Sequence, residues 1–239
     1  MPLLLVHGEL VSGEMFEPIV GHLSKLYRVI IPDLRGHGRS RDMPPPYTPA
    51  HLASDLSSLL DHLGVTSAAI LGYSQGGAIA QQLVLDYPTR CRRLVLVCTY
   101  AYNMATFKEK LEGFVTTLLI RVLDPKVFAK LVVSLGAKKL SKETADRIIN
   151  LIAANDKKRV ILFWKELLAF DSRKRLSEIR CPTLIIAGAK DGGVPIHHAR
   201  MLHDRIADSQ LVVIENADHT LIWTFPEELV RALDKFLQS

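Results

Sequence analysis

Short apolar runs alternate with amphipathic segments along most of the chain. Six runs are rich in Val, Ile and Leu and contain few polar positions, which is typical of strands buried on both faces of a parallel sheet. These runs lie at residues 3–6, 28–31, 68–71, 94–98, 183–187 and 211–214. Apolar residues at helical spacing fill five further segments, at 15–26, 48–63, 76–86, 196–206 and 226–237. The alternation predicts an α/β fold with a mostly parallel, doubly wound sheet.

The interval from residue 101 to residue 180 interrupts this alternation, because it is too long for one crossover helix. Its apolar positions recur at helical spacing in about four groups, which predicts several helices inserted between two strands. We therefore expect residues 1–100 and 181–239 to form the core, and residues 101–180 to form a helical cap over the mouth of the sheet. The aromatic residues of the insertion are candidates for lining an apolar substrate pocket: Phe107, Phe114, Phe128, Phe163 and Trp164.

Composition narrows the class of protein. With 48% apolar and 23% charged residues in a chain of 239, the sequence is typical of a globular protein and not of a disordered one. The net charge of +5 comes from residues 101–180, which hold 17 Lys/Arg and 9 Asp/Glu. This excess is either a solvated helical surface or a positive field near a ligand entrance.

Several functional classes are excluded by what the sequence lacks. Basic runs are not interleaved with aromatic residues, so we expect no nucleic-acid partner. No apolar run is long enough to span a membrane, and the first residues do not resemble a signal peptide. The three cysteines, Cys91, Cys98 and Cys181, do not have the spacing of a metal site. They are interpreted as reduced thiols of a cytoplasmic protein, and Cys98 and Cys181 are expected to be buried.

A serine stands between glycines where a predicted strand becomes a predicted helix. The sequence Gly72-Tyr73-Ser74-Gln75-Gly76 fits the pattern G-x-S-x-G. This pattern has two interpretations, a plain glycine-rich turn or a nucleophile elbow that exposes the serine oxygen at the carboxyl end of the sheet. The position between strand and helix favours the elbow, with Ser74 as the nucleophile.

A serine hydroxyl needs a general base, and the base needs an orienting carboxylate. His219 follows the last predicted strand, and Asp191 follows the strand before it. Both therefore belong to the carboxyl edge of the sheet, where an open α/β sheet places its ligand crevice. The prediction is a triad of Ser74, His219 and Asp191. Asp218 is a poorer orienting acid, because neighbouring side chains diverge.

The remaining histidines give no sign of a metal site. The spacing of His197, His198 and His203 matches no metal motif, so these residues are interpreted as part of a surface helix. Three others are interpreted as surface or half-buried residues of helices: His22, His51 and His62. We expect neither a metal nor a cofactor.

An oxyanion that forms during acyl transfer needs two backbone donors. The N–H of Gln75, at a helix N-terminus, is one candidate. The second is the N–H of Glu9, which follows the first strand, where Gly8 lets the backbone pass close to the site. The alternative is that residues 7–10 form an ordinary strand-ending turn. His7 is expected to organise this loop by hydrogen bonding.

Taken in order, these motifs resemble the α/β-hydrolase fold superfamily, in its compact, capped, serine esterase, lactonase and haloperoxidase-like branch. The resemblance rests on five segments: 4–8, 32–40, 72–77, 181–191 and 216–219. It implies the triad and the two backbone donors named above. It also implies that residues 33–40 shape the core near the site, and that the insertion is the family's lid. Dehalogenases and epoxide hydrolases of the family carry aspartate as nucleophile, which disfavours both for a chain with Ser74.

The sequence departs from the family pattern at three places. Members usually begin with an antiparallel hairpin before the His-Gly strand, and that hairpin is missing from the expected elements here. Glu9 stands where an apolar or aromatic residue is common, and a carboxylate beside an oxyanion is unfavourable unless it points away. Asp218 stands where glycine is common, next to the predicted base.

The expected function is hydrolysis of carboxylic esters with small to medium apolar acyl or aromatic groups. The expected partner is a small-molecule ester, with neither nucleic acid nor a membrane involved, and a homo-oligomer is possible on sequence grounds. The same triad also suits a lactonase, a cofactor-free perhydrolase or haloperoxidase, or a carbon–carbon bond hydrolase. Outside enzymes, the chain suits a ligand sensor that has retained the triad.

Overall fold

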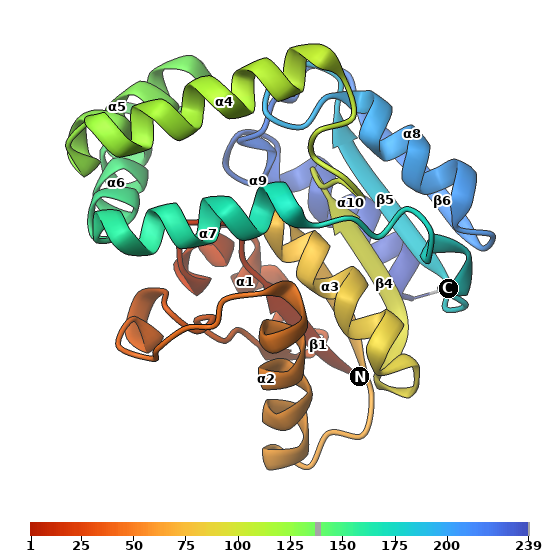
Figure 1. The fold of residues 1–239 in the computed structure, drawn as a ribbon. Helices are drawn as coiled ribbons and strands as arrows, with labels where there is room; N and C mark the ends of the chain where they lie inside the picture. The colour runs from red at the N-terminus through yellow and green to blue at the C-terminus, as the bar shows by residue number, and fades with distance from the viewer. Residues whose placement is uncertain (137–139, 239) are drawn as a thin grey trace.

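One parallel sheet contains all six predicted strands, in the order β2-β1-β3-β4-β5-β6 (Figure 1). The computed structural model describes residues 1–136 and 140–238. The strands are β1 Pro2–Val6, β2 Arg28–Ile30, β3 Ala68–Tyr73, β4 Cys91–Val97, β5 Thr183–Gly188 and β6 Ser209–Ile214. Each of the five neighbouring pairs is parallel, so the expected doubly wound sheet is confirmed. The chain leaves β1 for β2 and returns to β3 on the other side of β1, which creates a switch point beside β1.

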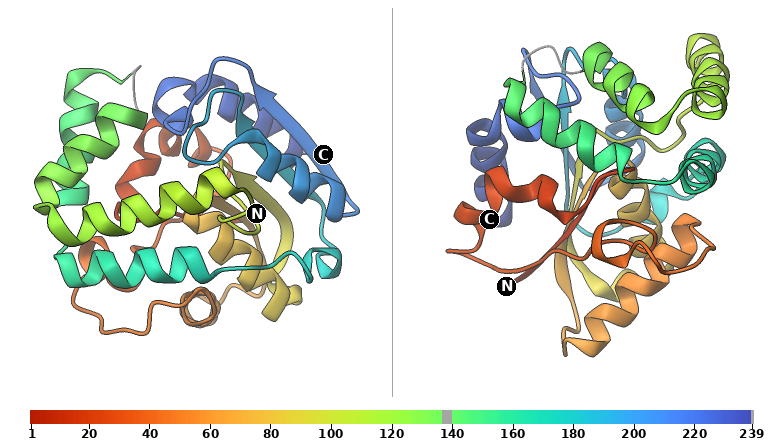
Figure 2. Two further views of the ribbon diagram at one scale, coloured as in Figure 1. Left: turned by 45° about the horizontal axis from the view of Figure 1, so that its top comes forward. Right: turned by 90° about the vertical axis from the view of Figure 1, so that its left-hand side faces the viewer.

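Helices cover both faces of the sheet (Figure 2). On one face lie α1 Glu17–Leu23, α9 Leu221–Thr224 and α10 Pro226–Leu237; on the other lie α2 Pro49–His62, α3 Gln75–Asp86 and α8 Ile196–Arg205. Successive strand side chains point to opposite faces, so Leu4 packs in one core cluster and Leu5 in the other. Burial on both faces explains why the strands are apolar runs without alternation. Short 3-10 turns occupy Gly13–Phe16, Gly38–Ser40, Pro88–Arg90 and Leu176–Glu178.

Four helices stand between β4 and β5: α4 Phe107–Val122, α5 Pro125–Gly136, α6 Lys142–Ala153 and α7 Lys157–Ala169. Figure 1 shows them grouped at the end of the sheet where β4 ends. Three of them begin with a polar N-cap, in which the side chains of Thr106, Ser141 and Asp156 each accept a hydrogen bond from a backbone N–H of the first turn. None of the described helices has the length and apolar character that a membrane crossing requires.

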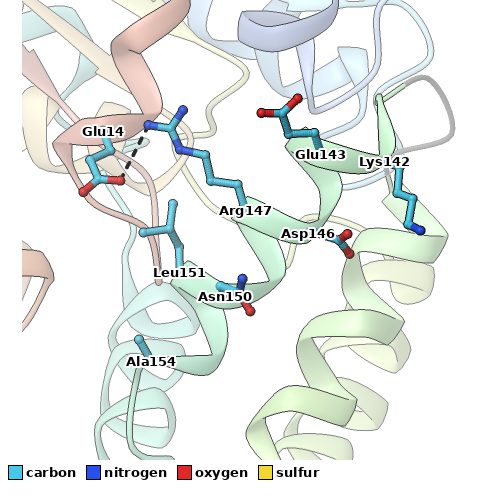
Figure 3. Close-up of a pocket in the computed structure, with 8 residues that line it drawn as sticks. All are labelled: Glu14, Lys142, Glu143, Asp146, Arg147, Asn150, Leu151 and Ala154. Atoms are coloured by element: carbon cyan, nitrogen blue, oxygen red, sulfur yellow. Dashed lines mark ion pairs between the residues drawn. The ribbon is translucent and has the colours of Figure 1, made fainter.

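The four helices contact the rest of the chain through both aromatic packing and ion pairs. Phe163 of α7 stacks against Tyr47, with ring centroids 4.5 Å apart. Arg147 of α6 lies 3.6 Å from a Glu14 carboxylate oxygen and 3.4 Å from a Glu17 oxygen. Figure 3 shows the Glu14–Arg147 ion pair at one side of an open pocket. The pocket is lined by Glu14, Lys142, Glu143, Asp146, Arg147, Asn150, Leu151 and Ala154, and thus by none of the predicted site residues.

Candidate active site

Ser74 forms a strained turn between β3 and α3. Its backbone angles are φ 54° and ψ −122°, in a region that residues other than glycine rarely adopt. Three hydrogen bonds hold it there: its N–H donates to the Val97 carbonyl at 2.9 Å, and its own carbonyl accepts from Gly77 N–H at 2.9 Å and from Thr99 Oγ1 at 2.6 Å. This strained geometry is that of a nucleophile elbow.

The glycines beside Ser74 are required by close packing of backbone on backbone. A Cβ added to Gly76 would lie 2.1 Å from the Val6 carbonyl oxygen, and one added to Gly72 would lie 2.3 Å from the Gly76 oxygen. No side chain moves out of the way in either case, because the clashing atoms are backbone. The start of α3 is therefore pressed against β1, which brings Ser74 to the residues that follow β1.

We expect Gly76→Ala to destabilise the fold by more than about 3 kcal/mol, because the clash forces β1 and α3 apart. Gly21→Ala is the matched control: nothing lies within 4 Å of its added Cβ, and the residue is in the interior of α1. That control should be stabilised by about 0.5–1 kcal/mol. Urea unfolding monitored by circular dichroism measures both. Equal stability of the two variants would contradict this packing.

The structure brings together the three residues of the predicted triad. His219 Nε2 lies 3.0 Å from Ser74 Oγ, and His219 Nδ1 lies 2.8 Å from Asp191 Oδ2. The other carboxylate oxygen of Asp191 accepts hydrogen bonds from Gly193 N–H at 2.9 Å and Val194 N–H at 2.8 Å. The carboxylate is therefore held in one orientation, and it favours the tautomer with the proton on Nδ1. Nε2 is then free to accept the Ser74 proton.

Tyr73, the residue before Ser74, holds the backbone around His219 in place through hydrogen bonds of its hydroxyl group. Its hydroxyl donates to the His219 carbonyl at 2.9 Å and accepts from Ile222 N–H at 3.4 Å. The side chain is almost entirely buried. Sequence reasoning missed this contact; the available signal was a buried strand-end tyrosine, whose hydroxyl needs a polar partner.

Opposing effects set the pKa of His219. Burial lowers the pKa, while the charge of Asp191 and its hydrogen bond raise it, with a smaller contribution from Asp218. The charge and hydrogen-bond effects dominate, so the pKa of His219 lies above its usual value of 6.5. A protonated imidazole at this position is thereby stabilised.

The backbone N–H groups of Gln75 and Glu9 both remain available near Ser74. Among the described residues, no acceptor receives a hydrogen bond from either group. A Cβ added to Gly8 would lie 3.4 Å from Ser74 Cβ, which shows how closely the loop after β1 passes Ser74. Gln75 begins α3, so its N–H is one of the unpaired donors of a helix N-terminus.

The Glu9 carboxyl is an unusual neighbour for such donors. Its Oε1 is completely buried and has no hydrogen-bond partner among the described residues. Burial raises the pKa of Glu9 to about 8. The group is therefore a neutral acid at pH 7, which removes the repulsion that a carboxylate would exert on a nearby oxyanion.

Two histidines fix the loops near the site without taking part in the triad. His7 Nε2 accepts a hydrogen bond from Leu34 N–H at 3.0 Å, and its Nδ1 lies 2.8 Å from the Gly8 carbonyl. Burial lowers the pKa of His7 to about 4, so it stays neutral. His37 Nε2 accepts from Leu10 N–H at 3.3 Å. His7 thus organises the loop by hydrogen bonding, as expected.

The five aromatic residues proposed for a pocket do not come together. Phe107 and Phe114 are 83% and 69% exposed on α4, whereas Phe128 and Phe163 are buried in a separate apolar cluster. Trp164 Nε1 donates to Thr117 Oγ1 at 2.8 Å, which joins α7 to α4. The exposed side of α4 carries an apolar set: Phe107, Leu111, Phe114, Val115, Leu118 and Val122.

The interpretation of His198 as a surface residue is wrong, because its side chain is fully buried at the start of α8. Of the described residues, two sets of three bring potential metal-binding atoms close together. One set contains Cys98 with Asp191 and His219, of which Asp191 already bonds to His219, and His219 also bonds to Ser74. The other consists of Glu109, His197 and His198.

Comparisons with known proteins agree with the observed fold. The model of a family described as alpha/beta hydrolase fold matches residues 1–226. A protein of Caulobacter vibrioides, named provisionally as the carbamate hydrolase RutD, is 30% identical over 233 residues, covering 95% of this chain and 87% of that protein. A poly(3-hydroxyalkanoate) depolymerase of Ectopseudomonas oleovorans is 30% identical over 243 residues, covering 100% and 84%. The solved structure of an esterase from Exiguobacterium antarcticum has a TM-score of 0.93 and 26% identity, covering 100% and 92%.

Proposed function

The chain belongs to the alpha/beta hydrolase fold family, and from this premise we propose that it is a serine hydrolase that cleaves carboxylic esters through an acyl-enzyme. The observation that carries the proposal is the continuous contact from Ser74 Oγ to His219 Nε2 at 3.0 Å and from His219 Nδ1 to Asp191 Oδ2 at 2.8 Å. A hydroxyl with a base and an orienting acid in this order is equipped for nucleophilic attack on a carbonyl.

In the proposed reaction, Ser74 Oγ attacks the ester carbonyl carbon while its proton moves to His219 Nε2. Asp191 holds the imidazole and stabilises its cation. The carbonyl oxygen becomes an oxyanion that accepts hydrogen bonds from the N–H groups of Gln75 and Glu9. His219 returns the proton to the leaving alcohol as the carbon–oxygen bond breaks. Water, deprotonated by His219, then attacks the acyl carbon, and His219 returns this proton to Ser74 Oγ as the bond between Ser74 and the acyl group breaks and the acid leaves.

The choice of esters is supported by relatives. The Exiguobacterium antarcticum protein is named an esterase, and the Ectopseudomonas oleovorans protein is named a depolymerase of a poly(3-hydroxyalkanoate), which is a polyester. We propose small to medium acyl or aromatic groups as substrates, and that proposal rests on the apolar composition of the cap. The exposure of Phe107 and Phe114 leaves Trp164 as the half-buried candidate for contact with the acyl group.

A substrate panel tests the function. Purified protein is assayed with p-nitrophenyl esters of increasing acyl length, with lactones, and with carbon–carbon bond substrates such as β-diketones. The proposal predicts multiple turnovers on esters, with the highest kcat/KM at short or medium chains. If the protein turned over only lactones or only diketones, it would be a lactonase or a carbon–carbon bond hydrolase that uses the same triad. A single turnover followed by a stable complex would indicate a ligand sensor.

The dependence of kcat/KM on pH tests the shifted pKa values of His219 and Glu9. Only neutral His219 accepts a proton, so kcat/KM for an ester should rise with pH, with a midpoint above 6.5. Glu9 loses its proton near pH 8 and then repels the oxyanion, so kcat/KM should fall again with a midpoint near 8. In Glu9→Gln, which stays neutral, the fall should vanish and the rise should remain. Glu227→Gln, an exposed position on α10, is the control that should keep both limbs.

Initial rates corrected for spontaneous hydrolysis give these profiles. If Glu9→Gln kept the alkaline fall at the same midpoint, Glu9 would have no influence on the transition state.

A further inference from the structure

Three side chains with metal-binding atoms meet where the cap contacts the core, and the proposed reaction uses none of them. Glu109 lies in the first turn of α4, while His197 and His198 lie at the start of α8. Figure 1 shows the beginnings of these two helices near each other. Glu109 Oε1 is 2.9 Å from His197 Nε2 and 3.0 Å from His198 Nε2. One carboxylate oxygen and two imidazole nitrogens therefore surround a small volume.

The imidazole rings of His197 and His198 differ in their orientation toward the Glu109 carboxylate. His198 Nε2 and Glu109 Oε1 have the geometry of a hydrogen bond. His197 Nε2 is just as close to the same oxygen, yet it does not have that geometry, and this buried atom has no hydrogen-bond partner among the described residues. The ligand atoms of a metal point toward a common centre and not toward one another. A buried, unpartnered nitrogen beside a carboxylate fits such a centre.

The residues around this cluster hold its members in place. Glu109 Oε2 accepts a hydrogen bond from Thr106 N–H at 2.8 Å, as part of a capping box, which leaves Oε1 directed at the histidines. The His198 side chain is fully buried, whereas that of His197 is 40% exposed. The exposed part of the His197 ring therefore lies at the protein surface, while its Nε2 is buried beside Glu109.

We propose that Glu109 Oε1, His197 Nε2 and His198 Nε2 bind a divalent first-row transition-metal ion of the Zn²⁺ type, which links the cap helix α4 to the core helix α8. Two imidazoles and a carboxylate are ligands that Zn²⁺ prefers, and water completes a four-coordinate site. Tetrahedral bonds of about 2.0–2.1 Å separate neighbouring ligand atoms by about 3.3–3.4 Å. The observed 2.9 and 3.0 Å need to open by only a few tenths of an ångström.

Titration of the full-length, chelator-treated protein with Zn²⁺, followed by calorimetry, tests the site. We expect one saturable site, and a rise of the melting temperature with Zn²⁺, because an ion that binds only the folded state stabilises it. His197→Ala and Glu109→Gln should each weaken binding by at least about 100-fold, the upper end of the loss that substitutions around metal ligands cause. Glu109→Gln retains an oxygen for the Thr106 cap. His62→Ala, an exposed histidine at the end of α2, is the matched control and should bind as the parent does.

Co²⁺ provides a second signal, because visible absorption bands report its coordination by nitrogen and oxygen ligands. Absence of saturable binding would overturn the proposal and leave a metal-free hydrogen-bonded contact. Binding that survives in both variants would also overturn it. So would a thiolate-to-cobalt absorption band, which would place the ion at a cysteine: Cys98 beside Asp191 and His219, or the pair Cys91 and Cys181, whose sulfurs lie 3.7 Å apart. None of these measurements uses ester hydrolysis, so their outcome is independent of the proposed function.

Discussion

Ser74→Ala should lower kcat/KM for the best ester substrate by about 10⁴- to 10⁶-fold, because it removes the atom that forms the acyl-enzyme. Residual turnover should come only from substrate binding and the oxyanion donors. The substitution removes one oxygen and keeps a residue with Cβ at the strained position, so the fold should be retained. Steady-state rates with p-nitrophenyl esters measure the effect, with a thermal melt to show that the variant is folded.

Ser57→Ala is the matched control, because Ser57 is a buried serine on α2, away from the triad. It should retain kcat/KM within about twofold, as expected for a change that leaves the reacting groups in place. If Ser74→Ala lost less than about tenfold, another group would be the nucleophile and the elbow would have a structural role only.

Asp191→Asn should lower kcat by about 10⁴-fold with little change in fold. An asparagine amide in place of Asp191 Oδ2 would direct an N–H toward His219 Nδ1, and the proton would then move to Nε2. Nε2 could no longer accept the Ser74 proton. The substitution also removes the main interaction that raises the pKa of His219, so the acid limb of the remaining activity should shift to lower pH.

Asp218→Asn distinguishes the two candidate acids. Asp218 Oδ1 accepts hydrogen bonds from Thr220 N–H at 2.8 Å and from Thr220 Oγ1 at 2.5 Å, so it caps the turn after His219 and does not bond to the imidazole. We expect less than about a tenfold loss of kcat, since the charge removed is the smallest of those effects that raise the pKa of His219. A larger loss for Asp218→Asn than for Asp191→Asn would identify Asp218 as the orienting acid.

The sheet and the proximity of the three predicted triad residues could be predicted from the sequence, because both depend on the apolar runs and on the parallel order of the strands. Strands buried on both faces appear as continuous apolar runs, and their parallel order places every carboxyl end at one edge. Ser74, Asp191 and His219 each follow such a run, so their proximity follows from topology without knowledge of side-chain packing. The glycines at positions 72 and 76 were interpretable for the same reason, since the elbow leaves no room for a Cβ.

The arrangement of helices α4 to α7 could not be predicted to the same depth, because helical periodicity shows an apolar stripe but not the side to which it faces. On α4 most of the large apolar residues are exposed, Ile120 being a buried exception, and smaller residues face inward. Gly113 packs against Met104 and Leu168, and Thr117 bonds to Trp164. This reverses the usual assignment of large apolar residues to the interior. The pocket residues inferred from composition were therefore spread over different faces.

Contacts between distant segments were equally hidden. Glu109 and His198 are 89 positions apart, and only the docking of the cap brings them together. The neutral state of Glu9 depends on burial of its carboxyl group, which no local sequence pattern reveals. The role of Tyr73 depends on the loop around His219, 146 positions away.

Mass spectrometry after reaction with a fluorophosphonate probe shows whether Ser74 is an activated nucleophile. We expect one covalent adduct per chain, located on the peptide that contains Ser74, and no adduct in Ser74→Ala. An unlabelled parent protein, or labelling that persists in Ser74→Ala, would contradict this expectation.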